Sequence, residues 1–285
     1  MKILQVPANA GYGGMPLQVL TLARGLAGRG HEVGILTMSD GPMVEKYRES
    51  GIEVDVVPFL GRKMRRDPLV AIKTIRFIRA AIARSQPDVI HSHGPRAGLF
   101  TGLAVRGRTQ PLMVDTAHGS FSQFSMGNES AFSGPKRWIR DRQYRYIDRL
   151  TGRYAAGVIA VCEATREDLV EELGLPPDKV VVIRNGIEES PYDAGASAAI
   201  RAHLAGNSGE KLVVFVGRVA FHKGVGFHAD AAEAAIAHEP GARFVIIAEV
   251  PMEEGACKRA AAGPPAGRVR ALGRTSDGAD HKRAR

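Results

Sequence analysis

A chain of 285 residues with 44% hydrophobic residues is long enough for two domains and apolar enough for a substantial core. Its formal net charge of +9 would suit a nucleic-acid partner, but residues 255–285 carry eight Lys and Arg against two Asp. Since that segment supplies six of the nine positive charges, the rest of the chain is nearly balanced, and we expect no nucleic-acid partner.

The chain opens on a short apolar segment, residues 3–6, that ends at Pro7. This segment is too short and too soon interrupted for a signal peptide, and no apolar run approaches the roughly 20 residues that span a bilayer. The two cysteines, Cys162 and Cys257, lie in different segments and indicate neither a disulfide framework nor a metal site. We therefore expect a cytoplasmic protein.

Apolar strands alternate with helical patterns in the first part of the chain. Strands are predicted at residues 3–6, 33–37, 54–57, 89–91, 112–115, 158–161 and 180–183, and helices at 17–26, 69–83 and 165–173. This alternation is typical of a parallel α/β sheet with helices on both faces. We predict a complete, doubly wound, Rossmann-like domain over residues 1–190.

Glycines follow the first predicted strand, as Gly11-Tyr12-Gly13-Gly14. Before a helix, such residues let backbone N–H groups approach a phosphate or a sugar. A dinucleotide fingerprint starting at Gly11 would need glycine at position 16, where Pro16 stands, which counts against a nicotinamide enzyme. The alternative is a turn that requires positive φ.

Histidines end two neighbouring strands. His91 and His93 fall on the same side of the pleat, but spacing places no third metal ligand, so a structural role is favoured. His118 follows the fifth strand, at the edge where ligands of open α/β sheets bind, and a neutral imidazole there can bond a sugar hydroxyl. A histidine satisfied within the core is the competing interpretation.

A helical period runs over residues 136–154. It places Arg142, Arg145, Arg149 and Arg153 in a stripe beside an apolar face that includes Ile139. Such a stripe could lie on an anionic membrane that supplies a lipid acceptor. More often it is the solvated flank of a core helix, so membrane contact is the minority interpretation.

A second domain is expected to begin after residues 194–209, a stretch rich in Ala, Gly and Ser for which no element is predicted. Beyond it, strands are predicted at 212–216, 243–248 and 269–272, and a helix at 224–237. Residues 260–285 show little periodicity and are expected to be largely loop or disordered. We predict an incomplete second domain over residues 191–285.

The most informative segment is residues 214–224. An apolar strand ends at Gly217-Arg218, and a short loop delivers Lys223-Gly224 to the start of a predicted helix. Two cations and a helix N-terminus at the end of a parallel strand suit a diphosphate. The alternative is an ordinary strand-to-helix turn with two solvated basic residues.

These segments together resemble family 4 retaining glycosyltransferases of GT-B fold. Residues 217–224 match the family's Gly-Arg and Lys-Gly signature, residues 116–119 its Thr-x-His-Gly element, and residues 185–188 its domain-junction element, with Glu188 in place of Asp. The chain contains no Asp-x-Asp motif, so the metal-bridged donor chemistry of the other large glycosyltransferase fold has no visible ligands. No metal and no cofactor are therefore expected.

The resemblance implies roles for five residues. Arg218 and Lys223 would hold the diphosphate of a nucleotide-sugar donor, Gly13 and Gly14 would line the cleft, and His118 would lie beside the transferring sugar. The implied reaction moves that sugar to a hydroxyl acceptor with retention at the anomeric carbon. The first domain would then serve the acceptor and the second the nucleotide sugar.

The resemblance extends to about Asp277. The family's Glu-x7-Glu motif belongs beyond residue 285, so a C-terminally truncated and impaired enzyme is expected. The alternative is a non-catalytic fragment that at most binds a nucleotide.

Overall fold

The computed structural model describes residues 1–58, 69–119, 135–188, 193–205, 210–217, 224–247 and 269–272. The chain divides into two compact units, Met1–Glu188 and Glu189–Arg285. Each unit holds a parallel sheet of its own, flanked by helices.

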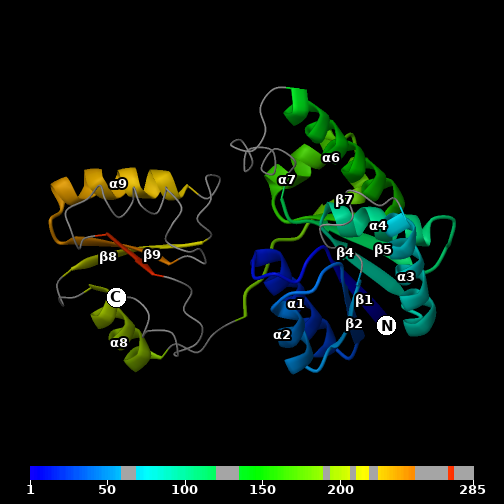
Figure 1. Cartoon of the computed structure of the whole chain (residues 1–285), viewed down its shortest axis with the longest axis horizontal. Coiled ribbons are helices and arrows are strands. Elements are labelled where there is room, and N and C mark those ends of the chain that lie inside the picture. The colour runs from blue at the N-terminus through cyan, green and yellow to red at the C-terminus, as the bar shows by residue number, and fades with distance from the viewer. Residues whose placement is uncertain are drawn as a thin grey trace. The chain divides into compact units, whose positions relative to one another are not determined.

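The first unit is built on a seven-stranded parallel sheet with the order β3-β2-β1-β4-β5-β6-β7 (Figure 1). Its strands are β1 (Lys2–Pro7), β2 (Glu32–Thr37), β3 (Glu53–Val56), β4 (Val89–His93), β5 (Leu112–Ala117), β6 (Gly157–Ala160) and β7 (Val180–Val182). All seven predicted strands are confirmed. The direction of strand addition reverses between β1 and β4, the point at which such sheets bind ligands.

Helices cover both faces of this sheet. They are α1 (Gly14–Ala27), α2 (Met43–Glu49), α3 (Leu69–Ser85), α4 (Pro95–Val105), α6 (Pro135–Tyr154) and α7 (Glu163–Glu167), which continues as the π-helical turn η2 (Asp168–Glu172). Neighbouring residues of β2 show the two faces: Ile35 packs with α1 and α2, and Leu36 packs with α3 and α4. This alternation confirms the doubly wound architecture.

Helices α2 and α4 were absent from the sequence-based prediction. Helix α4 begins at Pro95, directly after Gly94 at φ 92, which is an ordinary place for proline because the first helical N–H has no partner in the helix. A Cβ on Gly102 of α4 would lie 2.3 Å from Cδ2 of Tyr154, so the glycine lets α6 approach α4 closely.

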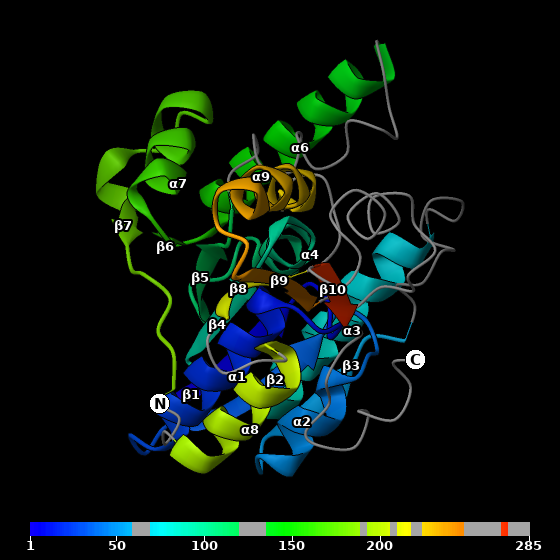
Figure 2. The ribbon, with the colours of Figure 1, turned by 90° about the vertical axis from the view of Figure 1, so that its left-hand side faces the viewer.

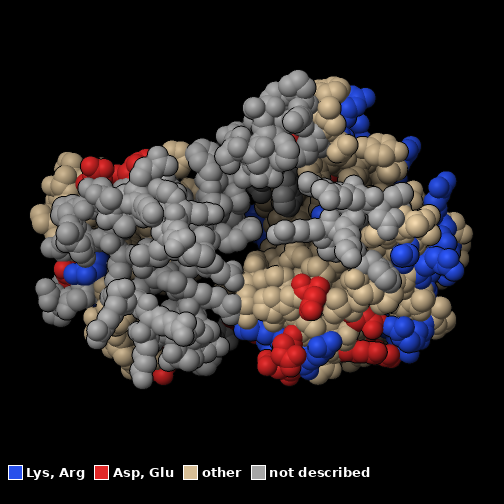
Figure 3. Space-filling view, in the orientation of Figure 1, with Lys and Arg blue, Asp and Glu red and all other residues tan. Residues whose placement is uncertain are grey.

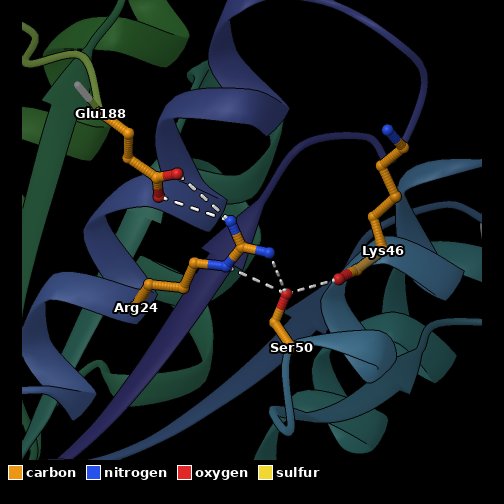
Figure 4. A network of polar contacts seen from close by, with 4 residues as sticks. All are labelled: Arg24, Lys46, Ser50 and Glu188. Atoms are coloured by element: carbon orange, nitrogen blue, oxygen red, sulfur yellow. Dashed lines mark hydrogen bonds and ion pairs between the residues drawn. The ribbon is translucent and has the colours of Figure 1, made fainter. Parts of the chain in front are cut away.

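The end of the first unit is tied to α1 by a network of polar contacts (Figure 4). Arg24 Nη1 lies 3.3 Å from one carboxylate oxygen of Glu188, and its Nε and Nη2 donate to Oγ of Ser50 at 3.1 and 2.8 Å. Ser50 Oγ donates in turn to the backbone oxygen of Lys46 at 2.8 Å. The predicted domain-junction residue Glu188 is therefore held by α1 and by the end of α2.

Charges on the first unit are mixed where α2 lies. Figure 3 shows acidic and basic side chains side by side there. Within α2, Arg48 forms an ion pair with Glu45 at 3.9 Å. On α6, Arg145 pairs with Glu172 at 3.1 Å and Arg149 Nε donates to the backbone oxygen of Leu173 at 2.9 Å. Part of the predicted basic stripe thus fastens η2.

Within the described residues, no helix combines the length and the apolar character needed to cross a membrane.

The second unit contains a parallel sheet of β8 (Lys211–Val216), β9 (Ala242–Ile247) and β10 (Val269–Leu272) in the order β10-β9-β8. Helix α9 (Val225–His238) lies on one face and α8 (Ala194–Ala205) on the other (Figures 1 and 2). Glu210 and Arg243 form a two-point ion pair, at 2.8 and 3.3 Å, within this unit.

Helix α8 occupies a stretch in which no element was predicted. Alanine is the best helix former, and Asp193 caps the helix start by accepting the Ala196 N–H on its side chain at 2.9 Å and the Ser197 N–H on its backbone oxygen at 2.9 Å. The predicted strands at 212–216, 243–248 and 269–272 and the helix at 224–237 are confirmed to within about a residue.

Candidate functional site

The candidate site lies at the carboxyl ends of β1, β4 and β5, which are neighbours in the sheet. The Ala8 N–H donates to the backbone oxygen of His93 at 3.0 Å, so the turn after β1 starts beside the end of β4. His118 follows β5 directly. The topology therefore brings Gly13, Gly14 and His118 to one edge, at the switch point of the sheet.

The turn after β1 is held by hydrogen bonds within the turn and with the segment before α2. The Gly11 N–H donates to Oδ1 of Asn9 at 3.2 Å, and the Met43 N–H donates to the backbone oxygen of Ala10 at 3.0 Å. A Cβ on Gly41 would lie 2.4 Å from that same oxygen, so only glycine fits there. The turn is thus seated on the segment that leads into α2.

Nothing among the described residues requires Gly13 or Gly14 to be glycine. Neither lies in the left-handed region of positive φ that favours glycine; Gly13 is in extended backbone, at φ 165. Among the described residues, a Cβ on Gly13 would meet only Cδ of Pro16, at 3.9 Å, and one on Gly14 would meet nothing within 4 Å. The interpretation of these two residues as a turn that requires positive φ is therefore wrong.

Both glycines are exposed at the start of α1. Within the described part of the chain, no side chain caps this helix, so the N–H groups of Gly14 and Met15 remain available ahead of Pro16, which has none. A 14-residue helix adds the positive end of its dipole at the same place. The start of α1 can therefore receive an anionic group.

Beside it, three polar side chains form a relay across the sheet. Gln5 Oε1 lies 2.6 Å from Nε2 of His93, and Nδ1 of His93 lies 2.9 Å from Nε2 of His118. Gln5 and His93 are fully buried, and His118 is partly exposed. His91 Nε2 contacts Oγ1 of Thr116 at 2.6 Å, and its ring centroid is 4.2 Å from that of His93.

These imidazoles are neutral at pH 7. Burial lowers the pKa of His118 to about 4 and, with the nearby His118, lowers the pKa of His91 to about 4. Burial and the two flanking histidines hold the pKa of His93 well below its ordinary value. His118 thus offers a neutral ring at the edge of the site, able to donate through one nitrogen and accept through the other.

A carboxyl group lies on the opposite face of the same strands. Asp115 Oδ1 accepts a hydrogen bond from Oγ of Ser92 at 2.5 Å. Burial raises the pKa of Asp115 to about 7, against the effect of the Ser92 hydrogen bond, and burial also raises the pKa of Asp148 on α6 to about 7. These groups lie beneath α4, away from the relay, and belong to the packing of α4 and α6.

The predicted diphosphate residues Arg218 and Lys223 lie outside the described residues. The segments on either side are described: the Gly217 N–H donates to the backbone oxygen of Ile247 at 3.0 Å after β8, and Gly224 caps α9 at φ 74. The predicted strand before these two residues and the predicted helix after them are confirmed.

The described residues outside this site offer a depression and no metal cluster. A surface depression of about 640 Å³ is lined by residues such as Met1, Asp88 and Leu112, at the amino ends of the strands, opposite the edge at which such sheets bind ligands. The described residues contain no group of three or more His, Cys, Asp or Glu side chains placed to hold a metal ion.

Residues 12–190 match the sequence profile of Glycosyltransferase Family 4. The chain belongs to glycosyltransferase family 4. This match includes Gly13, Gly14 and His118 and runs past the last strand of the first sheet.

Curated relatives of this family 4 chain include the D-inositol 3-phosphate glycosyltransferase of Nocardia farcinica, 30% identical over 227 residues, which cover 76% of this chain and 48% of the relative. The UDP-Gal:alpha-D-GlcNAc-diphosphoundecaprenol alpha-1,3-galactosyltransferase of Escherichia coli is 22% identical over 222 residues, which cover 76% of this chain and 54% of the relative. The chain thus spans about half the length of the curated relatives it matches.

Among solved structures, Anabaena Alr3699/HepE in complex with UDP and glucose aligns over 97% of this chain and 70% of its own, with a TM-score of 0.68 and 20% identity. A glycosyltransferase of Rickettsia africae aligns over 97% of this chain and 69% of its own, with a TM-score of 0.71 and 19% identity. The family match and these structural neighbours confirm the predicted α/β, GT-B-like fold.

The sequence-based prediction did not include Gln5 or His93 in the site, and it gave the strand that carries His91 and His93 a structural role. The available signal was Gln5 itself, a polar residue inside the apolar run of β1. Its partner could not be identified without the register that pairs Gln5 with His91 and Pro7 with His93.

Proposed function

We propose that this chain takes part in transferring a sugar from a nucleotide diphosphate sugar to a hydroxyl acceptor, with retention at the anomeric carbon. The observation that carries the proposal is the start of α1, where no described neighbour requires Gly13 or Gly14 to be glycine and both lie at the same sheet edge as the neutral His118. Bare backbone beside a helix N-terminus suits a diphosphate, and a neutral imidazole suits a sugar hydroxyl.

The two units take different parts in this proposal. The first unit supplies the acceptor side and His118. The second unit binds the nucleotide sugar through Arg218 and Lys223, which offset the charge of the leaving diphosphate. Support comes from the strand that ends just before these two cations, from the helix that begins just after them, and from the Anabaena neighbour, whose structure contains UDP and glucose.

An assay of the whole chain against a panel of nucleotide sugars and hydroxyl acceptors tests this function. We expect sugar transfer that falls strongly in His118→Ala, while the melting temperature falls only modestly because Nδ1 of His93 loses its partner. Nucleotide binding without any transfer would instead support the alternative, a non-catalytic nucleotide-binding chain. A large loss of stability in His118→Ala with normal specific activity would identify a core histidine. NMR of the anomeric proton in the product tests retention.

Peripheral contact with a membrane stays a prediction. Its support is the exposure of Trp138, Ile139 and Tyr146 on α6, together with the lipid-linked substrate named for the E. coli relative. Aromatic and basic residues on one helix suit an anionic interface. Flotation with vesicles of anionic lipid should carry the chain upward, and Trp138→Ala combined with Tyr146→Ala should reduce that flotation. Equal flotation of the variant would remove α6 as the contact.

A further inference from the structure

We propose that Gln5 and His93 are positioning residues that fix the tautomer of His118, so that His118 presents the lone pair of Nδ1 to a sugar hydroxyl. This inference rests on the proposed function for its ligand, but the tautomer is a property of the protein alone. The three side chains come from the neighbouring strands β1 and β4 and from the end of β5.

The first link of the relay sets the direction. Gln5 Oε1 is a carbonyl oxygen and can only accept, so His93 Nε2, at 2.6 Å, carries the proton and donates it to this oxygen. His93 is neutral, because burial and the flanking histidines hold its pKa well below its ordinary value. A neutral imidazole holds one proton, so Nδ1 of His93 has a free lone pair.

The second link passes this constraint to the site. Nδ1 of His93 must accept, and its partner at 2.9 Å is Nε2 of His118, which therefore carries the proton. His118 is neutral too, so its Nδ1 is left as an acceptor. Among the described residues no hydrogen bond reaches that Nδ1, and the ring is partly exposed.

The orientation of one amide thus decides what the site recognises. Turned over, Gln5 would donate its Nε2–H to His93, and each proton along the relay would move to the other ring nitrogen. His118 would then present an N–H, which attracts phosphate oxygens. In the orientation observed, Gln5 Nε2 is buried without a partner among the described residues. The free-energy cost of this unsatisfied donor falls on Gln5, at the buried end of the relay.

The chemical consequence is selectivity between parts of the same donor. An acceptor nitrogen bonds a sugar hydroxyl, which can donate, and repels a diphosphate oxygen, which cannot. His118 is therefore set for the sugar, while the start of α1 is left for the anionic group. His93 is fully buried, and its hydrogen bond with Nε2 of His118 holds that ring in place.

Long-range 15N NMR of the histidine rings in the ligand-free chain tests the tautomer directly. We expect a protonated Nε2 and an unprotonated Nδ1 for His118 in the wild type. Gln5→Leu should leave a mixture of both tautomers, and Gln5→Glu, which keeps an acceptor, should retain the wild-type pattern. Thr116→Val is the matched control: it removes the contact to His91, outside the relay, and should leave the His118 signals unchanged.

A wild-type His118 protonated on Nδ1, or a Gln5→Leu signal identical to the wild type, would overturn the inference. The wild-type spectrum alone decides the first point, even where a variant fails to fold. Binding adds a second readout: Gln5→Leu should weaken a nucleotide sugar about two- to tenfold, the range of one neutral hydrogen bond, and leave a nucleoside diphosphate unchanged. Absence of transfer by the wild type would count against the proposed function and leave the tautomer result intact.

Discussion

Thr151 of α6 lies so close to Gly98 of α4 that a Cβ on the glycine would stand 2.3 Å from Thr151 Cγ2. Asp115 Oδ1 would be 3.0 Å from the same Cβ. Gly98 therefore determines how closely α6 approaches the sheet and how tightly Asp115 is enclosed.

Substitution Gly98→Ala should destabilise the first unit by about 1–3 kcal/mol, the usual cost of overpacking a filled core. Gly25→Ala is a matched control in α1, where a Cβ would meet, of the described residues, just a side-chain nitrogen of Arg29 at 4.0 Å. That control should be neutral or stabilise by up to about 1 kcal/mol through helix propensity. Denaturant unfolding measures both, and equal effects would refute the close packing of α4 on α6.

At the start of α1, replacing glycine by alanine should affect ligand binding and leave stability unchanged. Gly14→Ala should leave the melting temperature nearly unchanged, because among the described residues a Cβ there meets nothing within 4 Å. The same methyl group would obstruct close approach of a diphosphate to the first-turn N–H groups. We expect at least about a tenfold loss of nucleoside diphosphate affinity, since a hydrogen bond to a charged group contributes about 1.5–3 kcal/mol. Unchanged affinity would mean that no ligand approaches α1.

The stability of the first unit should depend on the ionisation of Asp115. Its pKa is about 7 in the folded state against 3.8 for the free side chain, so the folded state holds the extra proton between these values. The stabilisation of the folded state by the protonated Asp115 carboxyl is therefore lost as pH rises from about 4 to about 7. Asp115→Asn removes this effect while the histidines titrate equally in both proteins. The melting temperature of the variant relative to the wild type should be higher at pH 8 than at pH 4.5; a difference independent of pH would contradict the raised pKa.

The contact between Arg24 and Glu188 should matter little for stability. Both side chains are about half exposed, and such pairs contribute about 0–1 kcal/mol. Arg24→Ala should lower the free energy of unfolding by about that amount, and Glu188→Gln by no more. Limited proteolysis between residues 183 and 188 should accelerate in both variants, because Glu188 is held there by Arg24. An unchanged cleavage rate would show that this contact does not anchor the end of the unit.

The sheet could be predicted from the sequence because its strands are buried on both faces and appear as short, continuous apolar runs. Helix α8 could not, since its Ala, Gly and Ser residues lack an apolar period and only the cap at Asp193 marks its start. The position of His118 followed from its place after a strand. Its partners did not, because the meeting of Gln5, His93 and His118 depends on strand register, which sequence patterns leave open.

Glycine illustrates the same limit at Gly13 and Gly14. The sequence allowed either a turn with positive φ or a ligand surface, and only the backbone angles and the space around each Cβ distinguish the two. Conversely, no sequence pattern distinguishes Gly41 or Gly98, although close contacts in the structure require glycine at both positions.

The proposed function requires that this chain bind the diphosphate of a nucleotide sugar, and calorimetry with a panel of nucleoside diphosphates measures that binding. Arg218→Ala and Lys223→Ala should each weaken binding by about 1.5–3 kcal/mol, as expected for a hydrogen bond between charged groups. Lys211→Ala is the control, because Lys211 lies in the same unit and pairs with Glu239 at 2.5 Å; its affinity should equal that of the wild type. Unchanged affinity in both Arg218→Ala and Lys223→Ala would contradict the claim.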